Sequence, residues 1–434
     1  MEQTLSRHLL ALSAIVSGTG LVQLANATLT TIIPLRLEAA GNSQESAGLV
    51  AAAYSAGFIL GCIFSPGTVA RVGYIRAFAA SAAVSSALAL LFDFYDHPAA
   101  WMAIRFVMGA AIAALLASAD SWISSSASES MRGRVVALYA IVISVAAILS
   151  QVLISMLGYS SDAIVTLVGI LIIVSIALVC LTRASEPDPG GDVRIELRKV
   201  FQTSQVSLLG CVASGMITTG MLTIIPFYLS NNGLDGNVVA MALASLYLGR
   251  LVLQWPIGFI SDRFDRRWIM LATYIVVSLL FLSMALIAPG EGRALSGSEG
   301  PYFEVAAYVG LGLIGGLVFP LYSLCVAHAF DRADGISGIS ITTTLLMAWA
   351  TGSIVGPLAL TALSTATGDR SAPLGIAGIC LALAIFTYSR IRQAPISLTA
   401  LRSKFSVIPV TSVSMGREVS GIIERQNEEN RHET

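Results

Sequence analysis

Stretches of more than twenty residues without a charged side chain recur along this 434-residue chain. The runs 8–35, 135–161 and 200–234 contain no Asp, Glu, Lys or Arg. About 20 apolar residues span a bilayer as a helix, and a helix satisfies its own backbone polar groups. Because 55% of the residues are hydrophobic and only 12% are charged, we expect an all-α membrane protein. A transmembrane barrel would need short alternating segments instead.

Windows of this kind predict twelve transmembrane helices, six on each side of a polar break. The break is a predicted cytoplasmic linker at 183–205, which separates an N-terminal bundle (1–182) from a C-terminal bundle (206–390). The polar tail 391–434 is expected to be disordered and cytoplasmic. The predicted spans are 8–37, 46–66, 75–93, 99–124, 135–158, 161–182, 206–230, 236–258, 268–288, 302–329, 337–364 and 373–390.

An internal repeat supports this division. The letters TIIP occur at 31–34 and again at 223–226, 192 residues further on. The same offset pairs Gly57 with Gly249 and Arg71 with Arg263. We therefore expect two parallel, pseudo-symmetric six-helix bundles with a substrate site between them, as in transporters built from repeats. The mismatches of the repeat, Arg36 and Arg250 above all, are where we expect specificity for the solute.

The distribution of Lys and Arg predicts that both termini are cytoplasmic. Loops on one predicted side hold most of the basic residues, whereas the opposite loops hold only Arg36, Arg293 and Arg370. Residues 8–27 also resemble a signal peptide that ends in a small-residue cleavage site. The internal counterpart of this region argues against cleavage.

The loop after the eighth predicted span carries the sharpest motif. It is GFISDRFDRR, residues 258–267, called the signature segment below. It resembles the signature loop of the major facilitator superfamily, although Asp265 stands where the family has glycine. The counterpart at 66–76 keeps Arg71 but has Ala70 in place of the aspartate. The resemblance extends to about residue 390, and QWPIG (254–258) and RGR (132–134) are similar to an uncharacterised bacterial branch that includes the YcaD-like proteins.

Charges in such a loop can bind the ends of neighbouring helices and act as a latch that holds one face shut. The alternative is that the basic residues only fix the topology. Asp120 is assigned to the latch rather than to the transport path, where it would need a raised pKa in a dry site. The predicted latch comprises Gly258, Asp262, Arg263, Arg267, Arg71, Asp120 and Arg132.

Ionisable groups inside the membrane are costly and therefore candidates for function. Arg250 has Phe58 as its repeat counterpart, so a scaffold role common to both halves does not explain it. It either holds a carboxylate or phosphate or pairs with a buried acidic side chain. Arg105 begins a helix-four pattern, RFVMG, and the resemblance implies a role in coupling or substrate binding; the alternative is snorkelling to the surface.

In the superfamily that the chain resembles, helices one, four, seven and ten line the cavity. Asn26 and Thr218 are polar counterparts in the repeat at mid-depth, although isolated Ser and Thr often bond their own helix. GSIVGP (352–357) suggests close helix contacts and a bend at Pro357. The predicted substrate-binding residues are Arg250, Arg105, Asn26, Gln23, Thr218, Thr219 and Tyr322.

Several function classes find no support. The five cysteines are scattered without CxxC spacing, so we expect no metal or cofactor. The net charge of −1 and the lack of a basic cluster do not favour nucleic acid, and no Walker loop suggests ATP. We expect a monomeric, non-enzymatic secondary transporter of a small solute in the bacterial inner membrane. The resemblance implies a proton gradient as the energy source, with facilitated diffusion as the alternative. The alternative is a sensor or interaction protein that kept the fold and lost transport.

Overall fold

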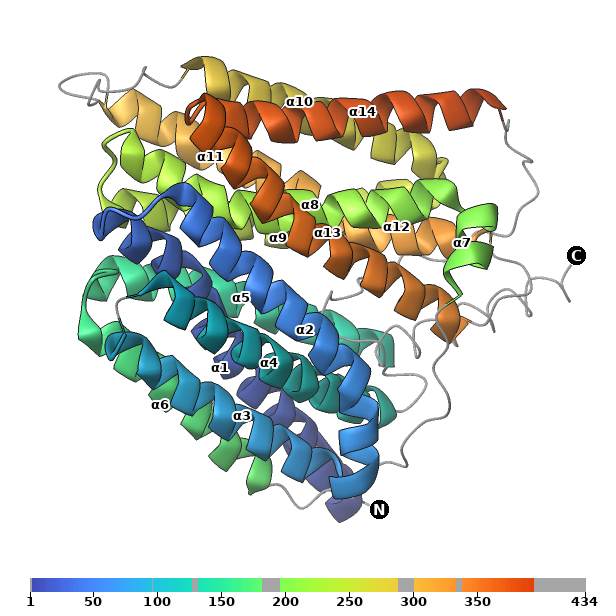
Figure 1. The fold of residues 1–434 in the computed structure, drawn as a ribbon. Coiled ribbons are helices and arrows are strands. Elements are labelled where there is room, and N and C mark those ends of the chain that lie inside the picture. Colours follow the sequence, from blue (N-terminus) through green and yellow to red (C-terminus); the bar gives the residue numbers. More distant parts are fainter. Residues whose placement is uncertain are drawn as a thin grey trace, which may run out of the picture.

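The computed structural model describes residues 2–95, 97–126, 132–181, 196–287, 300–332 and 338–393, which form helices joined by short turns. Figure 1 shows α1–α6 gathered on one side and α8–α14 on the other. The helices of the first group are α1 (Glu2–Ala39), α2 (Gln44–Val72), α3 (Tyr74–Leu90), the 3-10 turn η1 (Leu91–Asp93), α4 (Pro98–Ser126), α5 (Arg132–Leu157) and α6 (Asp162–Cys180). The second group follows α7 (Leu197–Thr203) and contains α8 (Gln205–Asn231), α9 (Gly236–Arg263), α10 (Arg266–Ile287), α11 (Gly300–Val318), α12 (Pro320–Phe330), α13 (Gly338–Thr367) and α14 (Ser371–Gln393).

Eleven spans in the described part of the chain are long and apolar enough to cross a membrane. One of them, Glu304–Phe330, comprises most of α11 and all of α12, and α1 is not among the eleven. The chain is therefore an all-helical protein with many membrane-spanning segments, and the count of twelve stays a prediction. The predicted tail beyond Gln393 and the linker residues 183–195 lie outside the described residues.

Two predicted helix ends fall short of the observed ones. The span expected at 236–258 continues to Arg263, and the one expected at 46–66 continues to Val72. The signature segment therefore comprises the last turns of α9, the two residues Phe264 and Asp265 between the helices, and the start of α10. Apolar windows end earlier than helices because the final turns can stay helical after their side chains become polar.

The tenth predicted span, 302–329, is interrupted. α11 ends at Val318, Phe319 forms a turn, and α12 begins at Pro320. Proline has no amide hydrogen, so it cannot donate the helical bond to the carbonyl four residues earlier, and its ring crowds that turn. The break leaves Phe319 between two helical segments, in the middle of the span.

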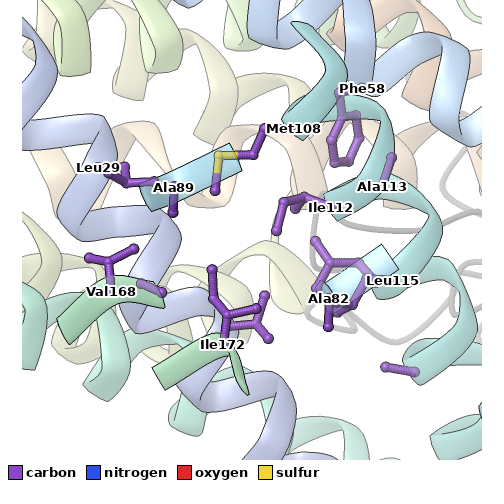
Figure 2. Packing of buried hydrophobic residues seen from close by; sticks show 14 of the residues in the cluster. Leu29, Phe58, Ala82, Ala89, Met108, Ile112, Ala113, Leu115, Val168 and Ile172 are labelled. Carbon is purple, nitrogen blue, oxygen red and sulfur yellow. The ribbon is translucent and has the colours of Figure 1, made fainter. Parts of the chain in front are cut away.

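The core of the first half is a continuous apolar cluster. Leu29 of α1, Met108 and Ile112 of α4, and Val168 and Ile172 of α6 belong to it (Figure 2). The halves meet where α2 packs on α13, α5 on α9 and α1 on α8. Helices from the two halves are thereby brought around a common centre.

Candidate functional site

A cavity of about 220 Å³ lies at the centre of the molecule, between the two halves. Its walls come from the middle of long helices, including α1 and α2 of the first half and α8, α9 and α13 of the second. The lining mixes polar and aromatic side chains, and among the described residues it contains two arginines but no Asp or Glu. The lining residues are Gln23, Asn26, Thr30, Ala51, Tyr54, Ser55, Phe58, Arg105, Leu116, Ile143, Thr218, Thr219, Leu222, Thr223, Arg250, Gln254, Phe319, Ser323, Trp349, Ala350 and Ser353.

Arg105 of α4 enters the cavity from the first half and is only 3% exposed. Its guanidinium carbon lies 4.1 Å from the centre of the Tyr54 ring on α2. It donates long hydrogen bonds to Asn26 Oδ1 (3.5 Å) and Thr30 Oγ1 (3.4 Å) of α1. Its contacts in the described structure are thus to neutral groups, and its Nε has no hydrogen-bond partner there.

Arg250 of α9 enters the same cavity from the second half. Its guanidinium carbon lies 5.0 Å from the centre of the Phe319 ring, at the break between α11 and α12. Phe319 in turn stacks on Tyr247, with 5.7 Å between the ring centres. Within the described residues, Arg250 forms no salt bridge and its buried Nε has no hydrogen-bond partner. The buried acidic partner that the sequence left open for Arg250 is therefore absent from the described part.

Several hydroxyl groups around the cavity are used within their own helices. Thr219 donates to the carbonyl of Gly215 (2.6 Å), and Thr223 donates to that of Thr219 (2.8 Å). Thr30 donates to the carbonyl of Asn26 (2.8 Å). Thr219 therefore follows the alternative stated above, in which a hydroxyl group bonds the backbone of its own helix. Fewer hydroxyl groups are left to donate to a ligand.

The structure brings most of the predicted binding residues together. Tyr322 differs: it is 1% exposed, packs in the core of the second half and does not line the cavity. Its neighbour Ser323 lines the cavity instead. The cavity-lining members of the predicted set are Gln23, Asn26, Arg105, Thr218, Thr219 and Arg250.

Sequence reasoning missed the aromatic part of the lining. Tyr54, Phe319 and Trp349 are aromatic residues in apolar spans, where such residues are common and carry no special signal. Pro320 was the available sign for Phe319, because a proline inside a predicted helix marks a break. For Tyr54 the available sign was its position one helical turn before Phe58, the repeat counterpart of Arg250, because residues one turn apart lie on the same face of a helix.

At the end of the molecule where α9 meets α10, the signature segment forms ion pairs. Asp262 Oδ1 lies 3.4 Å from Arg266, and Arg266 also pairs with Asp331 at 2.8 Å. Arg267 pairs with Asp265 at 2.8 Å. Burial alone would raise the pKa of Asp265, but hydrogen bonds from Arg267 outweigh it and hold that pKa below its usual value. Arg266 and Asp331 were not predicted to belong to this cluster.

The other predicted latch residues are dispersed. Arg263 stacks on Phe259, with its guanidinium carbon 4.2 Å from the ring centre. Gly258 is buried in α9, and Asp120 is fully buried in α4. Arg71 is exposed at the end of α2, and the side chain of Arg132 lies outside the described residues.

The described residues contain no group of three or more His, Cys, Asp or Glu side chains that could hold a metal ion. Gly352 and Gly356 of α13 lie directly against α8. A Cβ on Gly352 would overlap the carbonyl oxygen of Val212, and one on Gly356 would meet Met216. This is the close helix contact that the sequence suggested for GSIVGP.

The Major Facilitator Superfamily model matches residues 15–348 and 208–416. The uncharacterized MFS-type transporter YcaD of Shigella flexneri serotype 5b is 26% identical over 352 residues, which cover 79% of this chain and 86% of that protein. YcaD of Escherichia coli O139:H28 is 25% identical over the same shares. These matches confirm the resemblance to the YcaD-like branch.

Solved structures show the same fold. The crystal structure of the nucleoside transporter NupG aligns with a TM-score of 0.70 at 14% identity, covering 88% of this chain and 99% of that chain. The crystal structure of the E. coli fucose:proton symporter FucP, determined as a single-residue variant, aligns with a TM-score of 0.55 at 14% identity, covering 88% and 99%. At these identities the likeness concerns the fold.

Proposed function

Because the chain belongs to the Major Facilitator Superfamily, we propose that it is a secondary active transporter that moves a small solute by alternating access. The observation that carries this proposal is the central cavity, whose walls come from the middle of helices in both halves. A solute held there touches both halves, so a rocking motion between them would expose it to one side of the membrane and then the other.

We further propose that α1 is the twelfth membrane-spanning helix and that the halves are pseudo-symmetric bundles. Gly57 and Gly249 are repeat counterparts. Gly57 packs against the carbonyl oxygen of Phe106 in α4, and Gly249 packs against that of Gly312 in α11, with no space for a side chain in either case. Equivalent glycines with equivalent contacts favour two related bundles. The protein would be a monomer in the bacterial inner membrane with both termini in the cytoplasm.

The proposed energy source is the proton gradient. Because no described residue of the cavity lining is acidic, a coupled proton would be carried by a group outside this lining or by the solute itself. The two carboxylates of the signature segment, Asp262 and Asp265, belong to ion pairs, so they serve structure or gating in this proposal rather than proton transport.

Uptake into proteoliposomes tests the function. The purified chain is reconstituted, and a broad library of small solutes is offered with and without a pH gradient. We expect at least one solute to accumulate, and a pH gradient to increase its accumulation. Arg250→Ala is expected to reduce its uptake at least tenfold.

The rival function, a membrane sensor without transport, gives a different result. No solute would move under either condition, and Arg250→Ala would change nothing. Arg76→Ala is the matched control, because Arg76 is exposed on α3 and remote from the cavity lining. Its uptake should equal that of the natural chain.

A further inference from the structure

We propose that the central cavity binds a small organic anion, whose charged group is held by Arg250 from one half and Arg105 from the other. The inference deepens the proposed transport function and rests on it only for the anion's role as the transported solute. Binding itself requires nothing beyond the cavity.

In the part of the chain that the structure describes, the cavity lining carries two guanidinium groups and no carboxylate. A cation within a membrane is expensive unless a partner or water compensates it. Arg105 and Arg250 form no salt bridge within the described residues. Two positive charges facing a single small space favour an occupant of negative charge.

Both guanidinium groups keep hydrogen-bonding capacity for a ligand, because the bonds that Arg105 donates to Asn26 and Thr30 are long, at 3.5 and 3.4 Å. Arg105 stacks its face on Tyr54, and Arg250 stacks its face on Phe319. A stacked guanidinium keeps its N–H donors in the plane of the group, along its edges. The Nε atoms of both residues are buried without a hydrogen-bond partner among the described residues. Such edges match the paired oxygens of a carboxylate or phosphate.

The remaining walls indicate an organic body rather than a bare ion. Four aromatic side chains, Tyr54, Phe58, Phe319 and Trp349, share the lining with amide groups of Gln23 and Asn26. An inorganic ion would leave the aromatic surface wet, whereas an apolar group attached to the anion would cover it. The volume of about 220 Å³ limits the ligand to a small molecule.

Because the two arginines belong to different halves, a bound anion would also connect the halves. Arg105 belongs to α4 of the first half and Arg250 to α9 of the second. Without a ligand, their like charges oppose closure of the cavity. An anion between them replaces this repulsion with two attractions and links the halves directly.

Thermal unfolding of the purified full chain in detergent tests the proposal. The probes are benzoate against benzamide, phenyl phosphate against phenol, and inorganic phosphate, all at constant ionic strength. A ligand that binds only the folded state raises the melting temperature. We expect benzoate or phenyl phosphate to raise it, and their uncharged analogues to leave it unchanged at equal concentration. The inorganic ion should raise it less than the organic anions.

Substitutions assign the effect to the arginines. Arg250→Gln and Arg105→Gln should each weaken anion binding at least tenfold, Arg250→Lys should weaken it less than Arg250→Gln, and Arg76→Gln should bind as the natural chain does. The proposal is overturned if no anion in the panel binds, if the uncharged analogues stabilise equally, or if both Gln variants keep full affinity.

A variant that leaves both arginines in place covers the case in which their removal prevents folding. Thr218 lines the cavity on α8, so Thr218→Asp supplies a built-in carboxylate. It should raise the melting temperature without ligand and abolish stabilisation by anions, whereas Thr218→Asn should retain that stabilisation. Full anion binding by Thr218→Asp would contradict the proposal.

The outcomes for binding and for transport are separable. Anion-dependent stabilisation without uptake of any solute would remove the transport function and leave the anion site. Uptake of an uncharged or cationic solute, with no anion binding, would remove the anion site and leave the transport function.

Discussion

Arg36 is the clearest case of a single residue whose role changes when the structure is seen. Its side chain does not line the cavity. Instead its guanidinium pairs with Asp93 at 2.9 Å and donates to the carbonyl oxygens of Tyr159 and Ser161, each at 2.9 Å. It therefore joins the end of α1 to η1 and to the turn before α6, and these contacts favour a structural role over the expected selection of the solute.

We expect Arg36→Ala to lower stability without affecting the cavity. Three hydrogen bonds from a charged donor are lost, but the side chain is 15% exposed and solvent screens part of the effect, so the loss is about 1–2 kcal/mol. Thermal unfolding measures it, with Arg76→Ala as the exposed control. Stabilisation by the bound anion should be unchanged. A melting temperature equal to that of the natural chain would show that the three-way contact is not maintained.

At the level of single residues, charge was predictable and shape was not. An arginine in an apolar span costs enough to be noticed, which is why Arg250 and Arg105 could be singled out, and both line the cavity. The face of α12 that points to the cavity was harder to predict, because neighbouring polar and aromatic residues alternate there: Ser323 lies in the lining, whereas Tyr322 packs in the core.

Helix pairs within each half are held by close backbone contacts at glycine. In α2, a Cβ on Gly57 would overlap the carbonyl oxygen of Phe106 in α4. In α9, a Cβ on Gly249 would overlap the carbonyl oxygen of Gly312 in α11. Small residues allow such an approach between membrane helices, where packing replaces the hydrophobic drive of water. Each of these pairs also positions the next residue, Phe58 or Arg250, at the cavity.

Gly57→Ala should therefore destabilise the protein by about 1–3 kcal/mol, because the backbone of α2 or α4 must shift to admit the methyl group. At Gly67 of the same helix, a Cβ would meet no heavy atom of the described residues within 4 Å, apart from the adjoining backbone of its own helix. Gly67→Ala should be neutral or stabilise by up to about 1 kcal/mol. The comparison is made by thermal unfolding in one detergent. Equal melting temperatures for the two variants would contradict this packing argument.

Hydropathy predicts which segments form membrane-spanning helices but not the residues at which those helices end. The observed helices overlie the predicted spans because removing apolar side chains from water and pairing the backbone are both local demands. The ends of α2 and α9 and the short helix α7 involve polar residues, whose helical state depends on tertiary contacts. One such contact is the bond from the Glu196 amide to Thr344 Oγ1 of α13, at 3.0 Å.

Contacts between the halves gather at the end where α1 meets α8. Ser230 Oγ lies 2.8 Å from Glu38 Oε2, and these two residues are separated by the same 192 positions as the repeat. A bond between repeat counterparts agrees with the proposed two-fold relation, because counterparts meet only near such an axis. Nearby, Gly236 of α9 packs against the Tyr159 ring, and Gly48 of α2 packs against Thr361 of α13. The two halves are thus in direct contact at this end.

Alternating access by rocking of the two halves requires the contact between Glu38 and Ser230 to separate, and a covalent link there tests the requirement. Glu38→Cys and Ser230→Cys are combined in a chain whose exposed Cys180 is replaced by Ser; the other four cysteines are buried. A short reagent that joins the two thiols should stop uptake of the transported solute into proteoliposomes. Single-cysteine variants treated in the same way control for modification alone and should stay active. Cleavage of a reducible linker should restore uptake, because the link removes only the motion between α1 and α8.

Unchanged uptake by fully cross-linked protein would mean that the solute crosses without separation of these helices. Alternating access by rocking of the two halves would then be the wrong mechanism.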